Sequence, residues 1–116
     1  MATSDGTGEL LQGTLAMLVL KALMVKPMHG YGIARWVEDT TGDVLRIEEG
    51  SLYPALRRVE DRGWVTSAWG LSENNRRARW YTITPAGRAH LRAEAAQWLA
   101  FAEAVTRVLR GAPALA

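Results

Sequence analysis

The residues best suited to chemistry lie in the segment EGSLYPALRRVEDRG, at positions 49–63. Apolar side chains recur there at helical spacing, at Leu52, Leu56 and Val59, and Gly63 is expected to end the helix. The opposite face carries Ser51, Pro54, Arg57, Arg58 and Asp61. Arginine matches phosphate and guanine geometrically, and the DNA major groove admits a helix. The segment predicts a DNA-reading helix, with a solvated surface helix as the alternative.

Patterns for catalysis or metal binding are missing from the sequence. There is no cysteine, and the two histidines, His29 and His90, are far apart. Gly30 and Gly32 begin like a dinucleotide fingerprint, but Arg35 stands where the third glycine should be. Glycine here is expected to permit a close backbone approach, and His29 to be structural. We therefore expect no enzyme, no cofactor and no metal site.

Length and composition indicate one globular domain, and its basic charge permits a polyanionic partner. The chain has 116 residues, 48% of them hydrophobic and 22% charged, with a net charge of +2. Twelve of its basic residues are arginines, beside Lys21 and Lys26. The absence of cysteine fits a reducing compartment. Residues 1–10 do not resemble a secretory signal, and residues 1–8 are expected to form a flexible N-terminus. No apolar run is long enough for a membrane span. We expect a cytoplasmic protein with no membrane partner.

Two helices should precede the reading helix. The first, from Glu9 to about Val25, is apolar on most of its circumference and needs cover on several sides, either from a partner subunit or from its own domain. The second runs from about Gly30 to Thr40. Leu45 and Ile47 alternate as a short strand might, and Ser51 is a suitable cap for a helix starting between Glu49 and Leu52. This order predicts a helix-turn-helix.

A β-hairpin should follow the reading helix. Residues 64–69 and 79–84 are rich in aromatic and β-branched side chains, whereas residues 70–78 are polar and turn-rich. Arg76, Arg77 and Arg79 lie at or beside the hairpin tip. Beside a helix-turn-helix, such a hairpin predicts a wing whose arginines contact phosphates or enter a minor groove. A solvated hairpin tip is the alternative.

A long helix is expected from Pro85 to about Arg110, capped by Thr84. Its apolar residues alternate in spacings of four and three, as in the seam of a paired helix. They are Leu91, Ala95, Trp98, Ala102, Val105 and Leu109. Such a helix is about 40 Å long, so its outer half is expected to lie against a second subunit, with packing on its own domain as the alternative. Residues 111–116 are expected to form a flexible tail.

Four blocks of this chain resemble successive blocks of the PadR-like transcriptional regulators. They are LLQGTLAMLVLKAL at 10–23, HGYGIARWVEDTTG at 29–42, GSLYPALRRVEDRGWV at 50–65 and RRARWYTITPAGRAHL at 76–91. The resemblance covers most of the chain from Glu9 to about Leu99. Trp36 and the run Trp69 to Leu71 depart from the usual pattern, which affects the expected wing length and the packing of the second helix.

The resemblance implies a mostly α-helical α+β fold, a winged helix-turn-helix with a two-stranded wing and N- and C-terminal dimerisation helices. Residues 9–84 would form the DNA-binding domain and residues 85–110 the dimerisation helix. The implied DNA contacts are Ser51, Tyr53, Pro54, Arg57, Arg58, Arg76, Arg77 and Arg79. The expected dimer interface adds Leu11 and Leu15 to the six residues of the seam.

The function implied is a homodimeric regulator, expected to be a repressor, bound to an inverted-repeat operator in double-stranded DNA. A signal or small ligand would release it, and by analogy Leu11, Trp98 and Phe101 are candidates to bind a small aromatic effector. Simple interface packing is the alternative role of these residues. A winged helix that binds an acidic protein rather than DNA remains the competing function.

Overall fold

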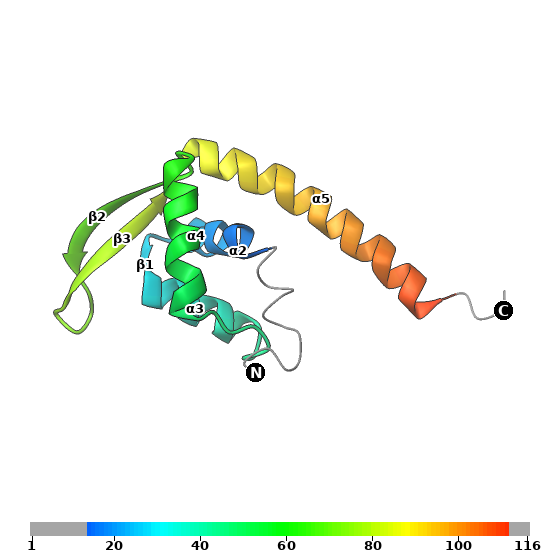
Figure 1. Ribbon diagram of the computed structural model, residues 1–116, viewed down its shortest axis with the longest axis horizontal. Helices are drawn as coiled ribbons and strands as arrows, with labels where there is room; N and C mark the ends of the chain where they lie inside the picture. The colour runs from blue at the N-terminus through cyan, green and yellow to red at the C-terminus, as the bar shows by residue number, and fades with distance from the viewer. Residues whose placement is uncertain (1–13, 112–116) are drawn as a thin grey trace.

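The computed structural model describes residues 14–111, which form a mostly helical α+β winged-helix fold. The elements, in order, are α2 (Leu15–Val25), β1 (Met28–His29), α3 (Gly30–Thr40), α4 (Glu49–Asp61), β2 (Val65–Leu71), β3 (Arg77–Ile83) and α5 (Pro85–Arg110). Figure 1 shows the hairpin of β2 and β3 leaving one side of the helical body and α5 leaving the other. The fold class expected from the sequence is confirmed.

Helix α2 lies at the centre of the core. It packs against α3, α4, α5 and β3, and Val19, Leu20 and Ala22 have no exposed surface. This cover explains why the helix is apolar on most of its circumference. Leu15, expected at a dimer interface, is only 2% exposed and lies in the protomer's own core. Leu11 and the expected start of this helix at Glu9 lie outside the described residues.

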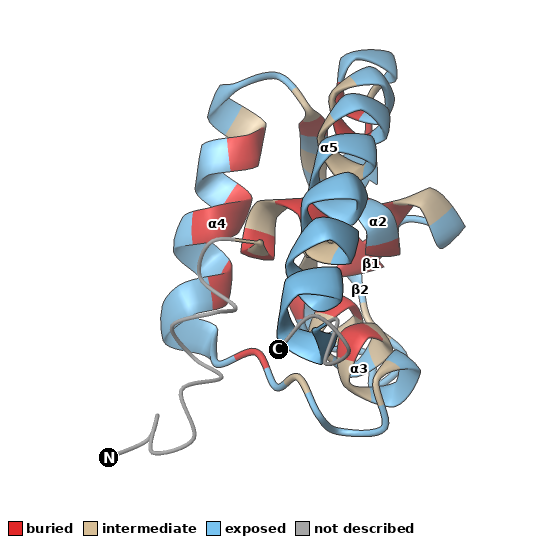
Figure 2. Ribbon diagram, turned by 90° about the vertical axis from the view of Figure 1, so that its right-hand side faces the viewer, coloured by how far each residue is buried: buried red, intermediate tan, exposed pale blue. Residues whose placement is uncertain are grey.

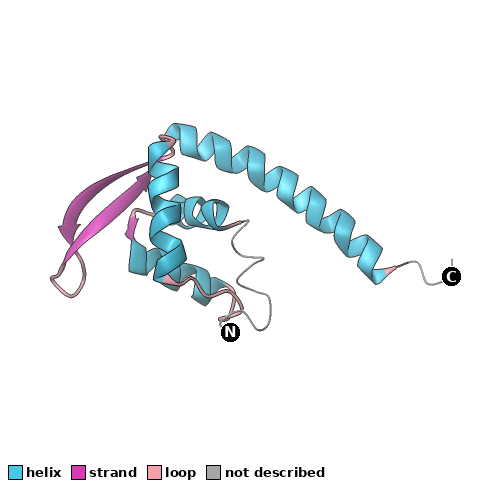
Figure 3. Ribbon diagram, viewed as in Figure 1, coloured by secondary structure: helices cyan, strands magenta, loops and turns pink. Residues whose placement is uncertain are grey.

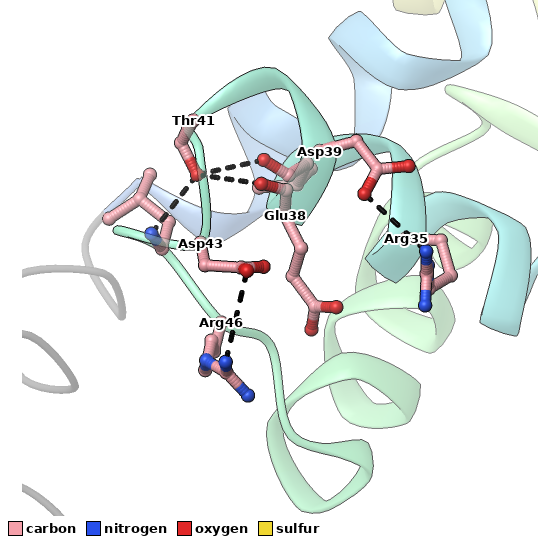
Figure 4. Close-up of polar contacts among 8 residues, drawn as sticks. Arg35, Glu38, Asp39, Thr41, Asp43 and Arg46 are labelled. Atoms are coloured by element: carbon pink, nitrogen blue, oxygen red, sulfur yellow. Dashed lines mark hydrogen bonds and ion pairs between the residues drawn. The ribbon is translucent and has the colours of Figure 1, made fainter.

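A compact turn joins α3 to α4 where a short strand was expected at Leu45 and Ile47. The hydroxyl of Thr41 donates to the carbonyl of Val37 at 2.9 Å and accepts from the N–H of Leu45 at 3.1 Å (Figure 4). Gly42 and Asp43 both have positive φ angles, of 58° and 65°. The chain therefore reverses within a few residues, and the strand prediction is wrong because the backbone bonds locally rather than to a neighbouring strand.

Helix α4 begins at Glu49, inside the expected interval, but Ser51 does not cap it. Glu48 holds the cap position without a side-chain hydrogen bond, and Ser51 is the third helical residue. Pro54 was expected in the first turn and lies in the second. Proline has no N–H to donate, so the carbonyl of Gly50 lacks its usual helical partner. Burial of the apolar face therefore has to hold the start of this helix.

The sheet has three antiparallel strands in the order β1-β3-β2, one more than expected (Figure 3). Strands β2 and β3 pair from Val65 with Ile83 to Leu71 with Arg77, so the turn spans only residues 72–76. Strand β1 pairs with the other edge of β3, with Met28 opposite Tyr81 and His29 opposite Trp80. Two residues after a proline are too few to show strand periodicity, which is why the sequence did not predict β1.

Helix α5 has the bounds expected from the sequence and is anchored at its first turn. Thr84 caps it by accepting from the N–H of Gly87 at 3.0 Å, and its hydroxyl donates to the carbonyl of Gly63 at 2.7 Å. Leu91 is 6% exposed and belongs to the protomer core, so its expected place in a dimer interface is not supported. Beyond Ala95 the helix is mostly exposed (Figure 2).

We expect Gly87→Ala to lower the free energy of unfolding by about 1–3 kcal/mol, because overpacking at a close contact is costly. A Cβ at this position would overlap the carbonyl of Trp64 and lie 2.9 Å from Cγ1 of Ile83. Chemical denaturation measures the change. Gly50→Ala is the matched control, since it adds a methyl group in open space and should leave stability equal or higher. Equal stability of the Gly87 variant would contradict the close packing.

Candidate nucleic-acid interface

The outer face of α4 presents the side chains that the sequence predicted for DNA contact. Ser51, Tyr53, Pro54, Arg57 and Arg58 are all exposed. The opposite face is buried through Leu52, Ala55, Leu56 and Val59. Because side chains three and four apart share one face of a helix, the apolar residues fix the rotation of α4 and turn its arginines outward.

Tyr53 links the start of α4 to the start of α3. A Cβ at Gly30 would lie 2.8 Å from the Tyr53 hydroxyl, so only glycine lets the ring approach α3 this closely. The sequence predicted a close approach of another backbone at these glycines, whereas the neighbour at Gly30 is the side chain of Tyr53 and Gly32 has only ordinary side-chain contacts at 3.5 Å. The contact places the exposed ring of Tyr53 between the two helices of the helix-turn-helix, at the edge of the cleft described next.

An open cleft separates the two N-terminal helix ends from the wing. It has a volume of about 790 Å³ and is lined on the helical side by His29, Gly30, Tyr31 and Tyr53. The wing lines the other side with Trp69, Ser72, Glu73, Asn74, Arg76, Arg77, Ala78, Arg79 and Tyr81. Arginine and aromatic side chains that face one open cleft are suited to a polyanion with stackable or apolar parts.

The three wing arginines are not equivalent. Arg76 is exposed in the turn, and Arg77 is exposed with its guanidinium carbon 4.5 Å from the centre of the Trp69 ring. Arg79 instead donates from Nε to the hydroxyl of Ser67 at 2.8 Å. That hydroxyl donates to Glu60 at 2.6 Å, and Glu60 lies 3.8 Å from Arg79. Arg79 therefore braces the wing against α4, and its charge is partly offset by Glu60.

Trp69 was not assigned to the site from the sequence, although the strand pattern could have placed it there. Trp69 is 57% exposed and pairs across the hairpin with Arg79. Alternate residues of a strand share a face, so Trp69, Arg77 and Arg79 face the same way. The guanidinium carbons of Arg77 and Arg79 lie 4.5 Å and 5.3 Å from the centre of the indole ring, and these contacts limit the directions that the two groups can take.

His29 and Glu73 connect the helix-turn-helix to the wing tip. The Nδ1 atom of His29 accepts from the N–H of Gly32 at 3.0 Å, and Nε2 lies 3.0 Å from Oε1 of Glu73. The sequence predicted a structural role for His29 but gave no indication of its partner. The hydrogen bond from His29, followed by one from its own backbone N–H, lowers the pKa of Glu73, so its carboxylate is ionised at neutral pH.

Metal binding and membrane insertion find no support in the part of the chain that the structure describes. Within residues 14–111 no group of three or more metal-ligating side chains is arranged to hold an ion. Burial raises the pKa of Tyr81, so its phenol is neutral at physiological pH. None of the helices in that range is long and apolar enough to cross a bilayer.

Comparison with known proteins decides the family. Residues 19–93, more than half of the chain, match the transcriptional regulator PadR-like family. The chain belongs to the PadR-like family. Its members are transcriptional regulators that bind DNA, and they are not enzymes. The outer face of α4 and the arginine-bearing wing thus belong to a protein whose family binds DNA.

Solved structures agree with the family. The chain is similar to a PadR family regulator from Eggerthella lenta DSM 2243, at 33% identity and a TM-score of 0.75, over 93% of this chain and 92% of that one. A transcriptional regulator from Clostridium thermocellum, Cth-833, is 26% identical with a TM-score of 0.76, over 84% and 95%. A 37.1 kDa protein of transposon Tn4556 from Streptomyces fradiae is 43% identical over 68% of this chain, which spans only 21% of that protein.

The outer half of α5 in this PadR-like regulator carries an uncovered apolar surface. Its large apolar side chains are at least 38% exposed, and they are Trp98, Leu99, Phe101, Val105, Val108 and Leu109. Ala95 and Ala102 are partly buried. Trp98 and Phe101, expected as effector contacts, stand on this surface and are not among the residues lining the cleft.

We expect Glu60 and Arg79 to be coupled in a double-mutant cycle. Each single change to glutamine should lower the free energy of unfolding, and the double change should cost less than their sum by a few tenths to about 1 kcal/mol. The partial exposure of both side chains limits the size of this coupling. Chemical denaturation of the four proteins measures it, and strict additivity would show that the brace is not formed in solution.

Proposed function

We propose that this protein is a homodimeric, sequence-specific transcriptional repressor that acts in the cytoplasm and binds an inverted-repeat operator. The observation that carries the proposal is that Arg57 of α4 and Arg79 of the wing line one hollow, which also includes Tyr53, Pro54, Glu60 and Tyr81. In this arrangement α4 enters a major groove, and Arg57 and Arg58 lie near base edges or phosphates. The wing places Arg76 and Arg77 on the backbone or in the adjacent minor groove, and Arg79 supports them from behind.

The experiment that tests the function is selection of bound duplexes from a random DNA pool, followed by footprinting. We expect an inverted repeat whose half-sites lie about one DNA turn, roughly 34 Å, apart. Recovery of no preferred sequence would argue against sequence-specific binding and favour a winged helix that contacts another protein.

The homodimer is proposed because α5 extends beyond the body with its apolar face uncovered. The molecule measures 60 Å along its longest axis and 20 Å along its shortest, and α5 supplies much of that length (Figure 1). Exposed apolar side chains spaced four and three apart on one helix are suited to a second such helix. Two copies joined in this way present two α4 helices related by two-fold symmetry, which is why the operator is expected to be an inverted repeat.

Release from DNA is proposed to follow binding of a signal or a small aromatic ligand at the same interface. Trp98 and Phe101 supply exposed aromatic surface there, and Leu11, the third expected contact, lies outside the described residues. Such rings can stack on a flat ligand, and they can equally pack against the partner helix. Repression and release are the parts of the proposal that rest on family resemblance rather than on contacts.

We expect Arg76→Ala and Arg77→Ala each to weaken binding to every duplex, specific and non-specific. Removing one phosphate contact should reduce the slope of log affinity against log salt by about 0.9. Fluorescence anisotropy at several salt concentrations measures this slope. Arg107→Ala removes the same charge from the far end of α5 and should leave the slope nearly unchanged. Unchanged slopes in both wing variants would contradict phosphate contact by the wing.

We expect Val105→Asp to shift the protein from dimer to monomer, because it places a charge in the apolar seam of α5. Analytical ultracentrifugation measures the oligomeric state, and circular dichroism verifies that the helix persists. Ala100→Asp is the matched control, as Ala100 is exposed on the side of α5 opposite the seam. If both variants sediment as the wild type does, the subunits do not associate through this face.

A further inference from the structure

The contact between His29 and Glu73 spans 44 positions of sequence and joins two parts of the proposed DNA-binding surface. His29 caps α3, the first helix of the helix-turn-helix, whereas Glu73 lies in the five-residue turn at the wing tip. The same short turn carries Arg76, and Arg77 begins β3 beside it. A hydrogen bond at this place can therefore determine where the wing arginines lie relative to the helices.

The geometry leaves His29 one way to bond to Glu73. Because Nδ1 accepts from the N–H of Gly32, the ring proton of the neutral imidazole sits on Nε2, which donates to the carboxylate. His29 is only 7% exposed, and its ring lies edge-on to that of Trp80, with 4.8 Å between ring centres. A buried N–H without a partner is costly. The helix cap, the aromatic contact and the strand pairing of β1 thus hold the imidazole rigidly, and it presents one donor to the wing.

Glu73 is otherwise an unfavourable residue at this position. It lines the proposed DNA cleft, and its side chain is 79% exposed. A carboxylate near the DNA backbone repels the phosphates and should reduce affinity. Electrostatics alone therefore predicts that removing Glu73 strengthens DNA binding.

We propose that the hydrogen bond from His29 to Glu73 is a tether that positions the wing tip for DNA binding. The inference rests on the proposed DNA-binding function of the wing. Glu73 is thus a positioning residue rather than a DNA contact: it holds the turn of residues 72–76 toward the start of α3. Since the turn is already placed, binding does not have to restrict it, and the arginines meet the backbone at lower entropic cost.

The test compares Glu73→Ala with Glu73→Gln on the selected operator duplex. Both variants remove the negative charge, but glutamine keeps an oxygen that can accept from Nε2 of His29. We expect Glu73→Ala to lower affinity about three- to tenfold, the size of one lost hydrogen bond. Glu73→Gln should match the wild type or bind more tightly. For affinity the matched control is Glu103→Ala, which removes an exposed carboxylate from α5, away from the cleft. Asn74→Ala, in the same turn, leaves both tether residues in place and is the control for hydrogen exchange.

The sign of the change decides the result. If Glu73→Ala binds the duplex as tightly as the wild type or more tightly, Glu73 affects affinity only by repelling the phosphates, and the tether proposal is overturned. It is also overturned if glutamine fails to restore the affinity lost with alanine. Failure of the wild type to bind any duplex would instead contradict the proposed function. A second measurement, made on the protein without DNA, would still test the tether.

That measurement is amide hydrogen exchange in the wing tip. The N–H of Asn75 donates to the carbonyl of Ser72 at 2.9 Å, and the N–H of Ser72 donates to the carbonyl of Arg76 at 2.8 Å. We expect both amides to exchange several times faster in Glu73→Ala than in Glu73→Gln or Asn74→Ala. His29→Asn should accelerate them too, since asparagine can still cap α3 but is too short to reach Glu73. Equal exchange in all variants would show that the tip is held by its own turn alone.

Discussion

The orientation of α4 depends on the burial of one apolar face against the core. Leu52, Leu56 and Val59 have at most 2% of their surface exposed, and α2 forms the central support behind them. Burial of each such side chain contributes about 1.5–3 kcal/mol, which is large beside any single surface contact. The helix depends on this burial, because Pro54 removes a helical hydrogen bond and no side chain caps the helix. The direction of the arginines follows from this packing and not from interactions of their own.

The wing is held at both its base and its tip. Near the base, Glu60, Ser67 and Arg79 connect it to α4, and at the tip Glu73 meets His29 at the start of α3. A two-stranded hairpin alone is marginally stable in water. Here the third strand and these two contacts turn it into a projection with a defined direction. These contacts connect the wing physically to α4 and to the start of α3.

Helix α5 continues directly from the last strand of the wing. Thr84 and Gly87 join its first turn to the chain between α4 and β2, so the helix leaves the body in a fixed direction. This joint converts any pairing of two α5 helices into a defined separation of two α4 helices. In the proposed dimer, a change in this pairing would therefore alter the separation of the two α4 helices.

Local patterns in the sequence were enough to predict several helices and strands of this protein. The two faces of α4, the bounds of α5 and its cap at Thr84 were all predicted from the sequence, because each depends on residues three or four apart. The hairpin was also predicted, since its aromatic and β-branched strands differ clearly from its polar turn. The family resemblance extended these elements to a winged helix, and the structure agrees.

Only the tertiary structure decided which groups meet across the fold. It placed Leu15 and Leu91 in the protomer core, paired β1 with β3, bound Arg79 to Glu60 through Ser67, and joined His29 to Glu73. The physical reason is that periodicity records which side of an element is apolar, but not what covers that side. A polar contact between residues 44 positions apart leaves no periodic signal, so it emerges only when the packing of the helices brings its two ends together.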